Sequence, residues 1–335
     1  MSKHEFSIPK LAALVPDEAA AYKFLEELRW TDGTPDACPH CDAAGKFYYL
    51  KPADGIARAT RTGNPTQRRI WKCASCRRKF SVLTGTPMHG TKISIRTWVL
   101  VIFEVVASKN SISAWEISRK YEIHNESAWF LLHRIREAMK MDPVAGLLGG
   151  AVQVDETWIG GEPKNRHAND PREAARKARP GRDGYAASDK QPVAALVHYE
   201  TRSVHAVAVP NVTGASLLPA IEHVMDLKRT VLHTDGHSGY KNIAGQFRAH
   251  EYVDHKAGEY TRGNVSTNLV EGFFSQLKRS INGTHHFVST EHLDRYLVQF
   301  AFMYTYCRAD DSQRMRALVG NMTGRRLPYK PLTSH

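Results

Sequence analysis

Apolar residues recur at helical spacing over two stretches of the first 140 residues. The stripe over residues 17–29 predicts a short amphipathic helix. Between residues 94 and 139 the spacing is helical throughout. A short helix opens there on a capping-box pattern at Ser113, and Asn125 is placed to cap a longer one. A short helix, a tight turn and a longer helix predict a helix-turn-helix, although any small helical bundle has similar spacing.

Beyond Gly149 the pattern changes to short apolar strands that alternate with helices. Strands are expected at 151–154, 193–199, 204–209, 230–233 and 251–254. Helices are expected at 215–225, 240–247, 267–281 and 291–306. Three strands followed by alternating helices and strands predict an α/β domain with a mixed five-stranded sheet. Residues 162–192 are rich in charged residues, proline, glycine and alanine, so we expect a loop or insertion there.

Composition narrows the class of protein. The chain has 335 residues, 42% of them hydrophobic, which excludes a mostly disordered chain and is enough for two or three domains. No apolar run approaches the ~20 residues that cross a bilayer, and the N-terminus has no stretch typical of a secretory signal. We therefore expect a cytoplasmic protein without a membrane partner. Its net charge of +12 points to a polyanionic partner.

Four of the five cysteines form two CxxC pairs, which is a spacing typical of metal sites. The pairs are Cys38 with Cys41 and Cys73 with Cys76. Four thiolates in two short turns can bind one tetrahedral Zn²⁺, and a full set of cysteines leaves no position open for substrate. We predict a structural zinc ribbon; two unrelated reduced pairs or a redox motif are the alternatives. Cys307, which lies among aromatic residues, is expected to be buried.

Positive charge is concentrated around the second cysteine pair. Residues 46–79 contain ten lysines and arginines against one acid, with Tyr48, Tyr49, Trp71 and Phe80 interleaved. A basic surface with aromatic residues suits contacts with DNA phosphates, and a protein-docking surface is the alternative. Arg134 and Arg136, on the longer helix of the expected helix-turn-helix, are further candidates for phosphate contacts.

Three carboxylates lie at positions where chemistry is expected. Asp155 and Asp235 each follow an apolar strand, and Glu271 lies on the long helix at 267–281. A single such residue is often only a cap or a turn residue, but carboxylates at strand ends together resemble a site for hard divalent cations. Mg²⁺ or Mn²⁺ held there would promote in-line attack on a phosphodiester. Lys278 lies on the same helix face as Glu271, two turns away, where it could hold a DNA phosphate.

Three segments resemble a known family. They are VDETWIGG (154–161), HTDGHSGY (233–240) and NLVEGFFSQLKRSINGTHHFVSTEHLDRYL (268–297), and LRWTDGTPDACPHC (28–41) matches the entry to the family's ribbon. Together they are similar to the DDE transposases of bacterial insertion sequences. The similarity is closest to the ISXO-type subgroup, which carries an N-terminal zinc ribbon and a ribonuclease-H-like catalytic domain. The resemblance runs from about residue 10 to residue 310.

The resemblance implies a site, partners and a domain plan. It implies Asp155, Asp235 and Glu271 as the metal-binding triad and Lys278 as the basic residue seven positions after the third acid. Asn268, one turn earlier, could contact the site or simply begin the helix. The implied partners are double-stranded DNA, both element ends and target, and further copies of the chain, at least as a dimer on DNA. The expected regions are 1–90, a helix and zinc ribbon; 91–145, a helix-turn-helix-like region; 146–310, the catalytic domain; and 311–335, a C-terminal tail.

The sequence departs from the family's pattern near the end of the catalytic domain. An aromatic-Arg-Tyr-Asn-x-Arg motif is replaced by the segment from Phe302 to Arg308, which puts in doubt any role of those side chains. Two other functions stay open from the residues alone. One is a zinc-ribbon transcription regulator, and the other is a metal-dependent nuclease or resolvase on the same fold. The paired strand-end carboxylates favour the enzymes, whereas transposase over nuclease rests on the resemblance.

Overall fold

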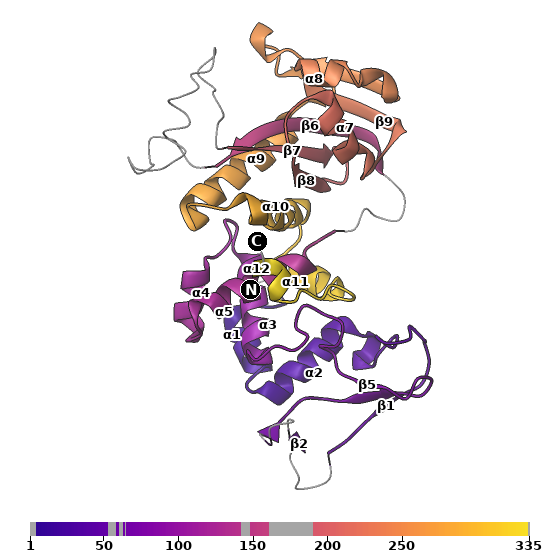
Figure 1. Ribbon diagram of the computed structural model, residues 1–335, viewed down its shortest axis with the longest axis vertical. Coiled ribbons are helices and arrows are strands. Elements are labelled where there is room, and N and C mark those ends of the chain that lie inside the picture. Colours follow the sequence, from indigo (N-terminus) through magenta and orange to yellow (C-terminus); the bar gives the residue numbers. More distant parts are fainter. Residues whose placement is uncertain are drawn as a thin grey trace. The chain divides into compact units, whose positions relative to one another are not determined.

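The chain separates into two compact units. The computed structural model describes residues 5–52, 58–59, 63, 65–141, 148–160 and 190–333. One unit combines residues 1–140 with 307–335, and the other comprises residues 141–306 (Figure 1). The expected insertion at 162–192 lies outside the described residues up to position 189. Among the described helices, none combines the length and apolar character needed to span a bilayer.

The first unit consists of helices with a small antiparallel ribbon. Its helices are α1 (Ile8–Leu14), α2 (Glu18–Arg29), η1 (Thr31–Gly33), α3 (Ile95–Ala107), α4 (Ala114–Tyr121), α5 (Asn125–Ala138), α11 (Asp311–Gly320) and α12 (Lys330–Thr333). The ribbon sheet has the order β1 (Phe47–Tyr49), β4 (Trp71–Cys73) and β5 (Lys79–Phe80). A separate pair joins β2 (Arg58–Ala59) to β3 (Pro65–Thr66).

The short helix, turn and longer helix predicted from residue 113 onwards are α4 and α5. The Ser113 hydroxyl accepts the Glu116 N–H at 3.1 Å and caps α4, as the sequence pattern predicts. Glu122 then adopts φ 52°, a left-handed conformation that ends the helix. Asn125 is the first residue of α5 and not its cap, because the N-cap position falls on His124.

The expected C-terminal tail contains an ordered helix of the first unit. Asp310 and Gln313 form a reciprocal capping box that begins α11. Met315, Leu318 and Val319 of that helix are buried, and α11 packs on α2 and α3. The apolar face of α11 needs such a partner, since a short helix is marginal in water by itself.

The second unit is built on one five-stranded mixed sheet. Its spatial order is β10 (Ala249–Val253), β9 (Met225–Asp235), β6 (Leu148–Ile159), β7 (Gln191–His198) and β8 (Val204–Ala208). Strands β6, β7 and β8 form an antiparallel meander, whereas β9 is parallel to β6 and β10 is parallel to β9. This is the ribonuclease-H-like arrangement that the sequence predicts.

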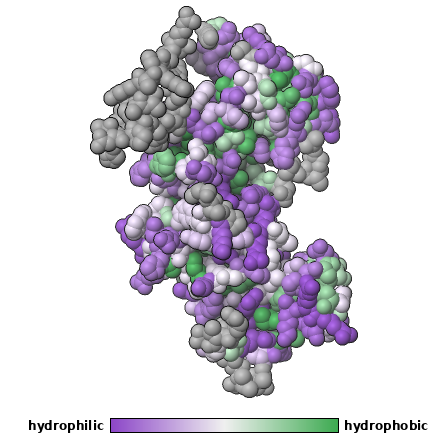
Figure 2. Space-filling view, in the orientation of Figure 1, coloured by the Kyte–Doolittle hydropathy of each residue, from purple (hydrophilic) through white to green (hydrophobic). Residues whose placement is uncertain are grey.

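Helices cover both faces of that sheet. They are α7 (Gly214–Glu222), α8 (Ser238–Lys241), α9 (Asn268–Ser280) and α10 (Thr290–Thr305), with the turns η3 (Ala244–Gln246), η4 (His255–Ala257) and η5 (Ile281–His285) and the hairpin β11 (Thr261–Arg262) and β12 (Val265–Ser266). Buried side chains of α9 and α10 pack on one face, and those of α7 and α8 on the other. Apolar side chains thus fill the cores on the two faces of the sheet, while hydrophilic residues cover most of the molecular surface visible in Figure 2.

Candidate active site and zinc centre

The four ribbon cysteines converge on one point. Their sulfur atoms all lie within 4.8 Å of one another, with Cys38 Sγ 3.7 Å from Cys76 Sγ and Cys41 Sγ 3.9 Å from Cys73 Sγ. Tetrahedral Zn²⁺ with Zn–S bonds of about 2.3 Å requires sulfur separations of about 3.8 Å. The cysteines are all free thiols and their geometry fits zinc, so this part of the chain is a zinc ribbon. Cys307 is exposed, contrary to expectation, because it follows the end of α10.

Most of the aromatic residues around the ribbon pack in or against its core. Trp71 and Phe80 are buried beside the cysteines. The Trp71 indole N–H donates to Glu26 of α2 at 2.8 Å, and Arg69 donates to the other carboxylate oxygen of Glu26 at 2.5 Å. Because Glu26 is only 1% exposed, these two bonds fix the ribbon on α2.

Four exposed basic side chains lie near the cysteine end of the ribbon. Lys46, Arg77, Arg78 and Lys79 are exposed, and the Lys46 ammonium lies 5.3 Å from the ring centre of the exposed Tyr48. These side chains are available for phosphate contacts. By contrast, Arg134 and Arg136 are 6% and 2% exposed.

The interpretation of the two arginines on α5 as phosphate contacts is therefore wrong. The Arg134 guanidinium lies over the Trp98 and Phe130 rings and donates to the His89 carbonyl. It packs in the core of the first unit because α5 turns that face toward α3. Helical spacing alone does not distinguish an arginine on the buried face from one on the exposed face.

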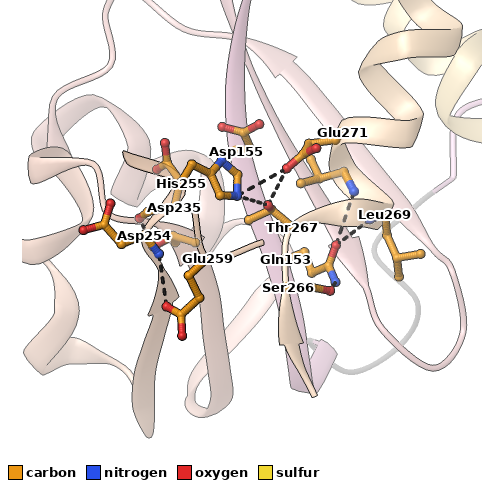
Figure 3. Close-up of polar contacts among 12 residues, drawn as sticks. Gln153, Asp155, Asp235, Asp254, His255, Glu259, Ser266, Thr267, Leu269 and Glu271 are labelled. Atoms are coloured by element: carbon orange, nitrogen blue, oxygen red, sulfur yellow. Dashed lines mark hydrogen bonds and ion pairs between the residues drawn. The ribbon is translucent and has the colours of Figure 1, made fainter. Parts of the chain in front are cut away.

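The three predicted carboxylates lie on three elements of the second unit. Asp155 is on β6 and Asp235 ends the neighbouring parallel strand β9. Gln153 pairs with His233 across these strands, so each aspartate lies two residues beyond that pair. Glu271 lies in the first turn of α9. In Figure 3 the three carboxylates lie in one region of the unit, around the ring of His255.

Electrostatics connect the three acids. The pKa of Asp155 is raised to about 7, chiefly by burial, with the charges of Glu156, Asp235 and Glu271 adding to the effect and the Glu156 N–H opposing it. A buried acid among other acids is costly unless a proton or a cation compensates it. Carboxylate oxygens are the ligands that Mg²⁺ prefers, so the donor set fits that ion.

The three carboxylates do not converge as closely as the four cysteines. Among the described residues, the cysteine cluster is the one group of metal-binding type whose ligand atoms all lie within 4.8 Å of one another. Glu271 is instead held by its own helix start, where Thr267 Oγ1 donates to Glu271 Oε1 at 2.5 Å, and His255 Nε2 lies 3.7 Å from the same oxygen. Asp235 Oδ1 accepts the His237 N–H at 3.1 Å.

Lys278 and Asn268 occupy the two ends of α9. Lys278 is exposed in its last turn, and Asn268 is its exposed first residue. The helical geometry places Lys278 on the Glu271 side of the helix, as the seven-residue spacing predicts.

Several residues around the acids were missed from sequence. Glu156 lies on the opposite face of β6, where its carboxylate accepts the Tyr240 hydroxyl at 2.6 Å and lies 3.6 Å from His237 Nδ1. Burial raises the pKa of Glu156. His237 and Tyr240 fall within the segment at 233–240, and alternation along β6 is the signal that assigns Glu156 to the second face. This second cluster holds the turn that carries Asp235.

A zinc ribbon ahead of a ribonuclease-H-like domain with carboxylates on two neighbouring parallel strands and on α9 is the plan of a DNA transposase. Residues 147–305 match the model of the ISXO2-like transposase domain, and residues 16–79 match that of the transposase zinc-ribbon domain. The chain thus has the domain pair of an ISXO2-like insertion-sequence transposase, which confirms the resemblance seen in the sequence.

A curated relative agrees with this placement. It is described as an uncharacterized protein in the transposable element ISH50 of Halobacterium salinarum. The two chains are 24% identical over 303 residues, which cover 90% of this chain and 96% of the relative. The similarity therefore extends over both units.

Proposed function

We propose that this transposase cuts and joins DNA strands with Mg²⁺ held by Asp155, Asp235 and Glu271. The observation that carries the proposal is the half-buried Asp155, which lies in one region with Asp235 of the neighbouring parallel strand and Glu271 of α9 (Figure 3). A bound divalent ion would offset that repulsion and stabilise the charge that develops on a phosphate during in-line attack. In the cutting step water would attack the phosphorus and a 3′-hydroxyl would leave. In the joining step that hydroxyl would attack a phosphorus of target DNA, and the 3′-oxygen of the target strand would leave.

The chain's own residues would supply binding and orientation. The exposed Lys46, Arg77, Arg78 and Lys79 of the ribbon, within the proposed DNA-binding regions 1–90 and 91–145, would contact phosphates at the element ends. Lys278 would hold a phosphate near the acids. Joining two ends to one target requires at least two copies of the catalytic domain 146–310, so we propose a dimer or higher oligomer on DNA. Its substrate would place the protein at the cytoplasmic nucleoid.

A strand-transfer assay tests this proposal. Purified protein, a labelled DNA carrying the element end and a target plasmid are incubated with Mg²⁺. We expect labelled end covalently joined to the plasmid, and we expect chelation of divalent ions to stop the reaction while end binding persists. Cleavage without joining would support the alternative of a nuclease or resolvase, and binding without either reaction would support the regulator.

A further inference from the structure

The helix that carries Glu271 starts without the usual cap. Thr267 occupies the N-cap position of α9, but its side chain makes no capping hydrogen bond. Its hydroxyl donates instead to Glu271 Oε1, four residues along the chain. The first N–H groups of a helix have no partner within the helix, and an unpaired N–H buried in a core is costly. Something other than Thr267 must therefore accept them.

Gln153 accepts them from the neighbouring strand. Its Oε1 accepts the Leu269 N–H at 2.8 Å and the Val270 N–H at 3.4 Å, the second and third residues of α9. Its Nε2 donates to the Ser266 hydroxyl at 3.1 Å (Figure 3). Two backbone donors fix the amide orientation, since only the oxygen can face them. The Gln153 side chain is fully buried, so solvent does not compete for these bonds.

The position of Gln153 links two of the proposed metal ligands. It lies two residues before Asp155 on β6, on the same face of the sheet. The residues it caps lie one and two positions before Glu271. The capping bonds span 116 and 117 residues of chain. One side chain thus joins the strand of the first acid to the helix start of the third.

We propose that Gln153 is a positioning residue that caps α9 from β6 in place of Thr267 and so sets the place of Glu271 relative to Asp155. This exchange leaves the Thr267 hydroxyl to orient the Glu271 carboxylate. The proposal rests on the proposed function for its link to metal, whereas the capping itself is independent of it. Loss of the cap would let the first turn of α9 fray, and Glu271 would then no longer be held at a fixed place relative to Asp155.

A substitution pair tests the link to metal. Gln153→Met keeps the length and removes the acceptor, and Gln299→Met makes the same change at a buried glutamine of α10. Both variants are prepared with zinc bound. Mn²⁺ binding is measured by titration, and the rate of DNA cleavage is measured as a function of Mn²⁺ concentration. We expect Gln153→Met to raise both the dissociation constant and the half-maximal concentration about tenfold. Gln299→Met should change thermal stability without moving either value. A wild-type Mn²⁺ dependence in Gln153→Met, or an equal shift in both variants, would overturn the proposal.

Hydrogen exchange tests the cap in the unaltered protein, whether or not the variants fold. The Leu269 and Val270 amides should exchange slowly, while the amide of Ala215, the second residue of α7, should exchange fast because the side chain of its N-cap Thr213 makes no capping hydrogen bond. Equally fast exchange at all three would contradict the proposal. Asp155→Asn in the same Mn²⁺ titration distinguishes the metal site from the Gln153 cap. Wild-type Mn²⁺ binding by this variant would contradict the proposed function, while slow exchange at Leu269 would still establish the cap.

Discussion

Asp155→Asn is expected to abolish strand cleavage and joining while the protein still binds the element end. Asparagine keeps the shape of the side chain but offers one neutral oxygen where the site needs a charged ligand. The Mg²⁺-dependent rate should fall at least about a thousandfold, because the charge that develops on the phosphate loses its compensation. Quantified strand-transfer products, beside gel-shift binding to the same labelled end, measure both properties. A variant that joins strands at the wild-type rate would show that Asp155 is not a ligand.

Stability provides the control for this variant. The pKa of Asp155 is about 7 in the metal-free folded protein against 3.8 for the ordinary carboxyl, so the folded state holds an extra proton between these values. Stability contributed by this group therefore falls as pH rises from about 4 to about 7. Since one pKa unit corresponds to about 1.4 kcal/mol, Asp155→Asn should stabilise the metal-free protein by up to about 4 kcal/mol at pH 8. The gain in stability should be smaller at pH 5. Because the variant is expected to be at least as stable as the wild-type protein, its inactivity would not reflect unfolding. Chemical denaturation at both pH values measures it.

Cys73→Ser is expected to remove zinc and with it the order of the ribbon. Cys73 ends β4 beside Trp71, and its sulfur lies 3.9 Å from that of Cys41, so three ligands would remain in an opened site. Metal binding at such sites is part of the folding energy. Zinc content by elemental analysis should fall from one ion per chain to near zero, and affinity for the element end should fall at least about tenfold.

Cys307→Ser is the matched control for that experiment. It removes an exposed thiol outside the cluster, so zinc content and end binding should stay unchanged. Full zinc content in Cys73→Ser would disprove the four-cysteine site. Loss of zinc with unchanged DNA affinity would support the four-cysteine zinc site but would show that the ribbon does not take part in DNA recognition.

The features predicted well from sequence were those with strong local signals. Paired cysteines, the strand that ends in Asp235 and the serine that caps α4 each follow a local pattern that few other structures produce, whereas the strand expected to end before Asp155 continues to Ile159. The α2, α4, α5 and α9 helices therefore begin within about a residue or two of their expected positions. The five-stranded sheet followed from the order of the elements.

What the sequence did not reveal depends on contacts between distant parts of the chain. In the sequence Arg134 resembles a surface residue, but it is buried against α3. Residues 311–320 resemble part of a tail, but their apolar side chains pack on α2 and α3 as helix α11. Gln153 has no signal of its own, because its partners lie more than 100 residues away. Helical and strand periodicities report which face a residue occupies, but not which element packs on that face.

A crystal structure of the protein bound to its element end and soaked with Mn²⁺ would locate the catalytic metal ions. Anomalous scattering peaks are expected between the carboxylates of Asp155, Asp235 and Glu271, with a DNA phosphate at the same ions. Zinc would give its own peak among the four cysteines of the ribbon. Manganese bound elsewhere, with these three carboxylates apart and without metal beside the DNA, would contradict the account.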